Sequence, residues 1–107
     1  MRPLTLTVLN AIDASVASTA SNAEDASYMI QCSAQTVATG SPVGVAKLQY
    51  SNDGANWTDI TGGSVSVSGA GTLGTQKIDL CFKYIRALYT KTSGTGNITT
   101  VLQLFGI

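Results

Sequence analysis

The chain has 107 residues, of which 44% are hydrophobic and only 11% are charged, and six basic residues balance six acidic ones. This length is typical of one compact domain, so we predict a single domain over residues 1–107. The balanced charge provides no basic stripe that could follow a phosphate backbone, so we expect no nucleic-acid partner. Abundant Thr, Ser and Gly favour strands and turns, which indicates an all-β protein.

The N-terminal segment, residues 1–27, begins with a predicted strand. Residues 4–9 alternate, with Leu4, Leu6 and Val8 on one face and threonines on the other. This alternation is not the continuous apolar run of a signal peptide or a membrane span, so we expect a protein made without secretion and without a membrane partner.

The rest of this segment, residues 13–27, is rich in Ala and Ser and is predicted to be a loop, with one helical turn as the alternative within it. Glu24 and Asp25 are its adjacent pair of charged residues. Neither the strand nor the loop is required by the core pattern of the remaining chain. We therefore predict an inter-subunit arm with five candidate contact residues: Leu4, Leu6, Val8, Glu24 and Asp25.

Three more strands are predicted in the central part of the chain. Residues 28–37 and 45–51 alternate apolar and polar side chains, and the Asp53-Gly54 pair then predicts a tight turn. A short strand over residues 57–60 follows the turn. Its Trp57 and Ile60 are three apart rather than two, so we expect a bulge or an abrupt end there.

The C-terminal half continues the pattern with strands over residues 64–68, 72–80, 82–90 and 98–105. Residues 82–90 carry large side chains on both faces, which predicts a strand in the middle of a sheet. In total the chain contains about eight short strands and no segment with helical periodicity. The predicted fold is an antiparallel β-sandwich or a jelly-roll-like barrel.

Catalytic and metal chemistry find little support in the sequence. Histidine is absent, which removes the commonest general base and metal ligand. Asp53, Asp59 and Asp79 are a possible carboxylate set, and residues 52–56 offer oxygen ligands for calcium without the order of an EF-hand. Ordinary turn and surface roles explain these residues better, so we expect no catalytic residue, no cofactor and no metal.

Two cysteines, Cys32 and Cys81, both lie in strand-like patterns. They are too few for a disulfide framework or a zinc site, and we expect both to be buried as small apolar side chains. A disulfide between them would require their strands to be neighbours.

Three aromatic residues, Tyr50, Trp57 and Tyr89, form an alternative candidate site, a platform for a sugar. The other interpretation of Trp57 is that it covers one end of the core, since a small sandwich needs a large side chain there. We favour the second interpretation.

Four runs of the sequence form a recognisable set: VAKLQYSNDG (45–54), NWTDI (56–60), KYIRALYT (83–90) and SGTGN (93–97). They resemble small β-sandwich virion proteins of tailed bacteriophages, of the head decoration or cement type. The resemblance extends from Tyr28 to the C-terminus, and similar runs also occur in discoidin-like domains and in phage domains that bind sugars.

This resemblance implies a protein made in the host bacterial cytoplasm that coats the capsid surface of the virion in many copies. Its expected partners are further copies of itself, as trimers, and the major capsid protein. The resulting hypothesis is a non-enzymatic capsid decoration protein. The alternative is a carbohydrate- or receptor-binding module on a phage tail or fibre, and an enzyme using two aspartates ranks last.

Overall fold

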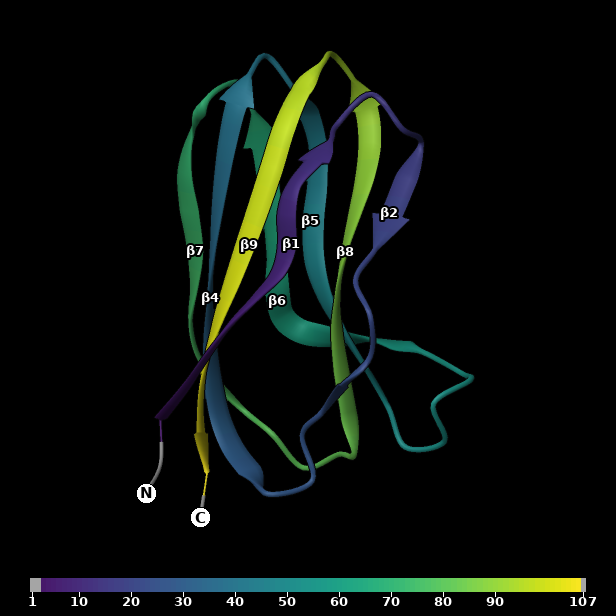
Figure 1. The fold of residues 1–107 in the computed structure, drawn as a ribbon, viewed down its shortest axis with the longest axis vertical. Coiled ribbons are helices and arrows are strands. Elements are labelled where there is room, and N and C mark those ends of the chain that lie inside the picture. Colours follow the sequence, from purple (N-terminus) through teal and green to yellow (C-terminus); the bar gives the residue numbers. More distant parts are fainter. Residues whose placement is uncertain (1–2, 107) are drawn as a thin grey trace.

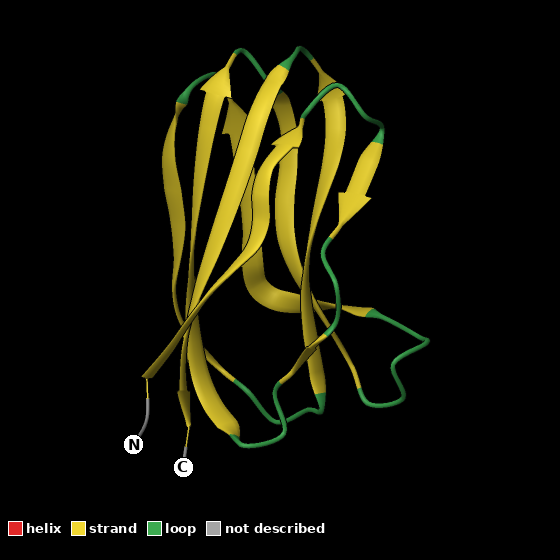
Figure 2. Ribbon diagram, in the orientation of Figure 1, coloured by secondary structure: helices red, strands yellow, loops and turns green. Residues whose placement is uncertain are grey.

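The computed structural model describes residues 3–106, apart from the side chains of Pro3, Gln76 and Lys77. These residues form nine strands in two antiparallel sheets that pack face to face (Figures 1 and 2). Among them there is no helix that could span a membrane. The predicted antiparallel sandwich is confirmed, and its two sheets keep open edges rather than closing into a barrel.

The first sheet has four strands, with β1 and β7 at its edges and β9 and β4 in the middle. The two middle strands pair along almost their whole length, from Met29 opposite Gly106 to Gly40 opposite Gly96. In spatial order the strands are β1 (Pro3–Asp13), β9 (Gly96–Gly106), β4 (Met29–Gly40) and β7 (Gly71–Asp79).

The second sheet has β8 and β5 in the middle and β6 at one edge, while two short strands pair with the other side of β8. Its strands are β2 (Ser18–Ala20), β3 (Glu24–Asp25), β8 (Tyr84–Ser93), β5 (Val43–Ser51) and β6 (Thr58–Ser68). The prediction that the segment around residues 82–90 lies in the middle of a sheet is confirmed, because β8 has partners on both sides.

The core lies between the sheets and follows the period-two alternation of the strands. On β8 the inward side chains are Ile85, Ala87 and Tyr89, and all three are buried. The largest fully buried apolar side chains come from both sheets: Tyr89, Leu9, Leu48, Ile85, Ile98, Leu102 and Leu104.

The N-terminal strand β1 departs from the simple alternation that the sequence predicts. Its pairing with β9 shifts between Thr7 and Leu9 and again between Leu9 and Ile12, and Ala11 has a positive φ of 49°. The first shift turns Leu9 inward, where it is 2% exposed. The alternation predicted for residues 4–9 therefore fails at Leu9, the last residue of that range.

The segment before β4 was predicted to be a plain loop that the core does not need, and this was wrong. It contains β2 and β3, and the side chains of Ala14 and Ala26 are fully buried. The two small methyl groups lie where the chain crosses between the sheets, Ala14 on leaving the first sheet and Ala26 on returning to it.

The two strands predicted over residues 57–60 and 64–68 form one strand, β6. Its pairing with β5 shifts between Lys47 and Gln49, at the point where the Gly62-Gly63 pair interrupts β6. Gly62 has a φ of 80°, and a Cβ atom on Gly63 would lie 3.2 Å from that of Leu48. The glycines thus bend the strand rather than end it.

Candidate functional site

The five residues predicted for the inter-subunit arm lie on two strands of different sheets: β1 is an edge strand of the first sheet, and β3 pairs with β8 of the second. Leu6 and Val8 are partly buried and pack against the core, whereas the sequence pattern predicted that the core does not need them. Leu4 is 41% exposed. On β3, Glu24 is half-buried and Asp25 is exposed. Their role in contacts stays a prediction.

The predicted aromatic platform is not assembled. Tyr89 is fully buried, so its ring cannot reach a surface ligand. Tyr50 lies on the inner face of β5, opposite the buried Ile85, while Trp57 lies beside Arg86 of the outer face. Since Tyr50 and Trp57 lie on opposite sides of the second sheet, the three rings share no surface.

Trp57 also does not cover the end of the core. The Arg86 guanidinium lies over its ring, with 4.3 Å between the Arg86 Cζ and the ring centroid. Arg86 Nε donates a hydrogen bond of 2.9 Å to Gln49 Oε1. Stacking and a hydrogen bond together fix the guanidinium plane on the outer face of the second sheet.

The same outer face carries a chain of polar contacts that continues from Gln49. Gln49 Nε2 donates to Asp59 Oδ1 at 2.8 Å, and Lys47 Nζ lies 3.1 Å from Asp59 Oδ2. These bonds, from Gln49 first and then Lys47, lower the pKa of Asp59. A carboxylate held ionised in this way is not suited to act as a general acid.

The turn that contains residues 52–56, considered above as a calcium loop, is closed by Asp53. Its carboxylate accepts hydrogen bonds from the backbone N–H groups of Ala55 and Asn56, from the Asn56 amide and from the Ser51 hydroxyl. These bonds, those from Asn56 first, hold the pKa of Asp53 well below its usual range. The hydrogen bonds of the Asp53 carboxylate thus stabilise the turn itself. Among the described residues there is no cluster of three side chains that could bind a metal ion.

Charge is distributed unevenly between the outer faces of the two sheets. On the first sheet, most outward side chains of β1, β9, β4 and β7 are hydroxyls, amides, Val or Phe, and the described charges, Asp13 and Asp79, lie at the ends of β1 and β7. We call this surface the uncharged face. Its central members are Thr5, Thr7, Gln31, Ser33, Gln35, Val37, Thr72, Thr99, Val101, Gln103 and Phe105.

One feature of the sequence indicates the uncharged face, although the alternation alone does not reveal it. The polar positions of the β4 and β9 alternations, such as Gln31, Ser33, Gln35 and Gln103, carry amides and hydroxyls where a solvated sheet usually has Lys and Glu. Only the pairing of these two strands shows that the positions meet on one surface.

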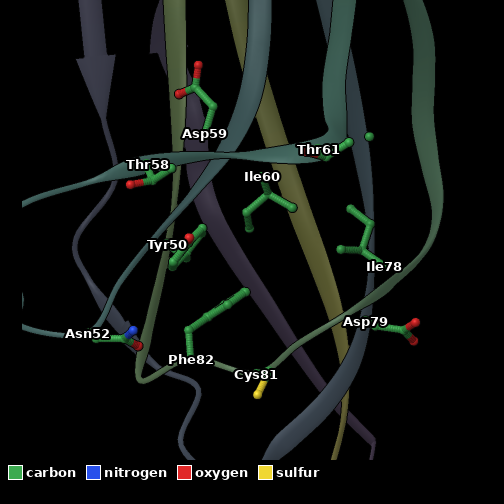
Figure 3. A pocket seen from close by; sticks show the side chains of 11 residues that line it. Tyr50, Asn52, Thr58, Asp59, Ile60, Thr61, Ile78, Asp79, Cys81 and Phe82 are labelled. Atoms are coloured by element: carbon green, nitrogen blue, oxygen red, sulfur yellow. The ribbon is translucent and has the colours of Figure 1, made fainter.

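A cleft of about 740 Å³ opens between the sheets where β6 begins and β7 ends (Figure 3). Its aromatic pair, Tyr50 and Phe82, stacks with ring centroids 4.8 Å apart and an interplanar angle of 18°. Ile60 and Ile78 lie beside the pair, as Figure 3 shows. The sequence alone could not find this cleft, because Phe82 enters it from the connection between β7 and β8.

The two cysteines are both free, and their environments differ. Cys32 is buried in β4 as predicted, and burial raises the pKa of its thiol to about 11. The prediction that Cys81 is also buried in a strand was wrong: it lies just beyond β7, is exposed, and lines the cleft. The strands β4 and β7 are neighbours, yet no disulfide joins the two thiols.

No protein-family model and no curated protein matches the sequence, whereas solved structures share its fold. XepA, a PBSX exported protein, is 11% identical with a TM-score of 0.80, and the match covers 97% of this chain but only 37% of XepA. The SPBc2 prophage-derived protein YomS is 12% identical with a TM-score of 0.69, over 96% of this chain and 92% of YomS.

A third similar structure is the C-terminal CBM6, a carbohydrate-binding module, of the laminarinase LamC from Zobellia galactanivorans. It is 12% identical with a TM-score of 0.58, and the match covers 97% of this chain and all of that module. At these identities the likeness establishes a common fold. The chain is therefore an all-β sandwich of a fold found in phage-derived proteins and in a carbohydrate-binding module.

Proposed function

We propose that this chain is a non-enzymatic structural protein of a phage virion, a decoration protein that binds the outer capsid surface in many copies and stabilises it. The observation that carries this proposal is the uncharged face. The fold shared with the phage-derived XepA and YomS supports it. Its partners are the major capsid protein and further copies of the chain, arranged as trimers.

The chemistry of the uncharged face suits docking onto a protein surface. Hydroxyl and amide groups lose less solvation free energy on burial than charged groups do, and they can form hydrogen bonds with main-chain groups of a partner. Four strands about 4.8 Å apart and about ten residues long present roughly 600 Å². That is close to the roughly 800 Å² that each partner buries in a standard interface.

The area of an interface does not fix its affinity, and symmetric copies increase the total affinity whatever one subunit contributes. If subunits of a trimer engage neighbouring capsid proteins together, the second and third contacts form at high effective concentration. We therefore expect the protein to bind assembled capsids much more tightly than isolated capsid subunits.

Cosedimentation with assembled capsids tests the proposal. Thr7, Val101 and Gln35 lie in register across β1, β9 and β4, so the double substitution Thr7→Lys/Gln35→Lys places two charges around the centre of the uncharged face. We expect this variant to stay folded, because both side chains are exposed, and to lose capsid binding by at least about tenfold.

The second sheet offers a matched control. Ser66, Val45 and Thr90 lie in register across β6, β5 and β8, and Ser66 and Thr90 are also exposed. Ser66→Lys/Thr90→Lys adds the same charge at the same spacing on the opposite face, and should bind capsids normally. Equal binding by both variants, or no binding by the unmodified protein, would contradict the proposal.

A carbohydrate- or receptor-binding role on a tail or fibre is the second candidate, favoured by the fold shared with the CBM6 of LamC. The platform predicted for it is not assembled, since Tyr89 is buried. This role therefore needs a different site, and the location of the protein in its native particle distinguishes it from capsid decoration. Imaging that places the chain on the tail would favour it.

A further inference from the structure

The cleft between β6 and β7 has an apolar floor of a size suited to a small ligand. Its volume of about 740 Å³ lies within the range of roughly 300–1,000 Å³ typical of ligand sites. The aromatic pair and two isoleucines form the floor, and Ile60 and Ile78 are each 8% exposed. Figure 3 shows Ile60 and Ile78 beside the stacked rings, and a ligand in the cleft would rest mainly on the aromatic pair, because the isoleucines are buried.

A rim of polar side chains surrounds this floor. We call Asn52, Thr58, Thr61 and Asp79 the polar rim; all four line the cleft and are exposed. Asn52 is held in place, since its Oδ1 accepts a hydrogen bond of 3.1 Å from the backbone N–H of Lys83. Its amide nitrogen can still donate, so the rim combines hydroxyl, amide and carboxylate groups.

The charges at the cleft restrict the ligand further. Asp59 and Asp79 contribute to the lining, and the described lining residues include no Lys or Arg. The Asp59 carboxylate is bound to Lys47 and Gln49, and Figure 3 shows it pointing away from the aromatic pair. Figure 3 shows Asp79 pointing away from the pair as well. A negatively charged ligand would find no described cation among the lining side chains, so an uncharged ligand is favoured.

We propose that this cleft binds a neutral pyranose sugar, whose apolar ring face packs on the aromatic pair and whose hydroxyl groups bond to the polar rim. A pyranose combines these two properties, because its axial C–H groups form an apolar patch while its equatorial hydroxyls point outward. The site differs from the platform considered above, of which it keeps only Tyr50. It is independent of capsid docking, since it shares only Asp79 with the uncharged face.

Titration of the labelled protein with cellobiose, maltose and N,N′-diacetylchitobiose, followed by amide NMR shifts, tests this site. We expect at least one of these neutral disaccharides to cause saturable shifts within residues 50–62 and 78–82, with a dissociation constant on the order of 1 mM. Glucuronic acid, of similar shape but negatively charged, should bind at least about fivefold more weakly than glucose.

Cys81 provides a way to block the cleft in the folded protein. It lines the cleft and is exposed, whereas Cys32 is buried, so N-ethylmaleimide should modify Cys81 selectively. The modified protein should lose the sugar-induced shifts. The Cys81→Ser variant should bind the sugar normally and remain insensitive to the reagent.

Loss of rim hydroxyls gives a second test that leaves the fold intact. Thr58→Val/Thr61→Val removes two exposed hydroxyls from the cleft, and Thr72→Val/Thr90→Val removes two from exposed strand positions outside it. The first pair should weaken sugar binding about fivefold or more, and the second pair should not change it.

Three outcomes would overturn this inference: no shift with any of the three disaccharides up to about 50 mM, shifts confined to the Trp57 and Arg86 surface, or full binding after modification of Cys81. None of them bears on capsid docking, which the cosedimentation experiment measures separately.

Discussion

The hydroxyl groups of Thr36 and Thr100 lie 3.0 Å apart inside the sandwich, where the two residues stand directly opposite each other on β4 and β9. Both side chains are buried, with exposed fractions of 3% and 2%. The pair satisfies its own hydrogen bonding in an apolar setting, so each hydroxyl depends on the other.

Single and double substitutions of this pair should therefore be strongly non-additive. Thr36→Val or Thr100→Val leaves one buried hydroxyl without its partner and should cost about 1–2 kcal/mol of unfolding free energy. The double variant replaces both by methyl groups of the same shape and should be within about 0.5 kcal/mol of the unmodified protein. Urea denaturation of the unmodified protein, the two single variants and the double variant gives the four unfolding free energies. If the losses of the single variants add up in the double variant, the expected coupling is contradicted.

Tyr89→Phe should increase stability. The Tyr89 hydroxyl is buried and has no hydrogen-bond partner in the described chain, because it lies over the bare backbone of Gly44, where a Cβ atom would be only 2.6 Å away. Removing an unsatisfied buried hydroxyl should raise the unfolding free energy by about 1 kcal/mol. Tyr50→Phe, at the half-buried Tyr50, is the control and should change it by less than about 0.5 kcal/mol. A loss of stability in Tyr89→Phe would show that the hydroxyl has a partner.

The two thiols should react at very different rates with a disulfide reagent at pH 8. The thiolate is the reactive form, and burial both shields Cys32 and raises the pKa of its thiol to about 11. We expect Cys81 to react within the mixing time of a manual assay and Cys32 only after urea unfolds the protein. In Cys81→Ser the fast phase should disappear, and its persistence would mean that Cys32 is accessible.

Stability should fall in acid and stay nearly constant from about pH 5 to pH 8, since the chain has no histidine. Hydrogen bonds lower the folded-state pKa of Asp13, Asp25, Asp53 and Asp59. A lowered pKa means that the unfolded state binds protons first, near pH 4, so the contribution of each group is present above that pH. It is lost as the pH falls toward the folded-state values.

Urea midpoints measured from pH 2 to pH 7 test this dependence. Asp53→Asn should be less stable at neutral pH and should show a shallower decline in acid, because it removes the group with the most strongly lowered pKa. If the stability of Asp53→Asn declines in acid as steeply as that of the unmodified protein, the acid sensitivity comes from the other three aspartates.

The sequence predicted the strands well wherever alternation ran without interruption. β4, β5, β8 and β9 lie within a few residues of their predicted ranges, because one face of each strand is buried. Alternation failed at the bulges of β1, where Val8 is inserted and Leu9 turns inward. It failed again at Gly62, which bends β6 without ending it.

The candidate surfaces were harder to predict than the strands, because they depend on which strands are neighbours. Tyr50 and Trp57 are close in sequence, yet the turn between them places the rings on opposite sides of the second sheet. Phe82, which stacks on Tyr50, comes from the connection after β7, and no local pattern links the two. Sequence reasoning found Tyr50 but could not find its partner.

The two register shifts in β1 have a consequence for the behaviour of the protein at high concentration. A free strand edge with a regular row of N–H and C=O groups is a template for another chain, and it promotes fibrils. The bulges around Leu9 and the positive φ of Ala11 interrupt that row in the second half of β1. The protein is thereby protected against edge-to-edge polymerisation through this part of β1.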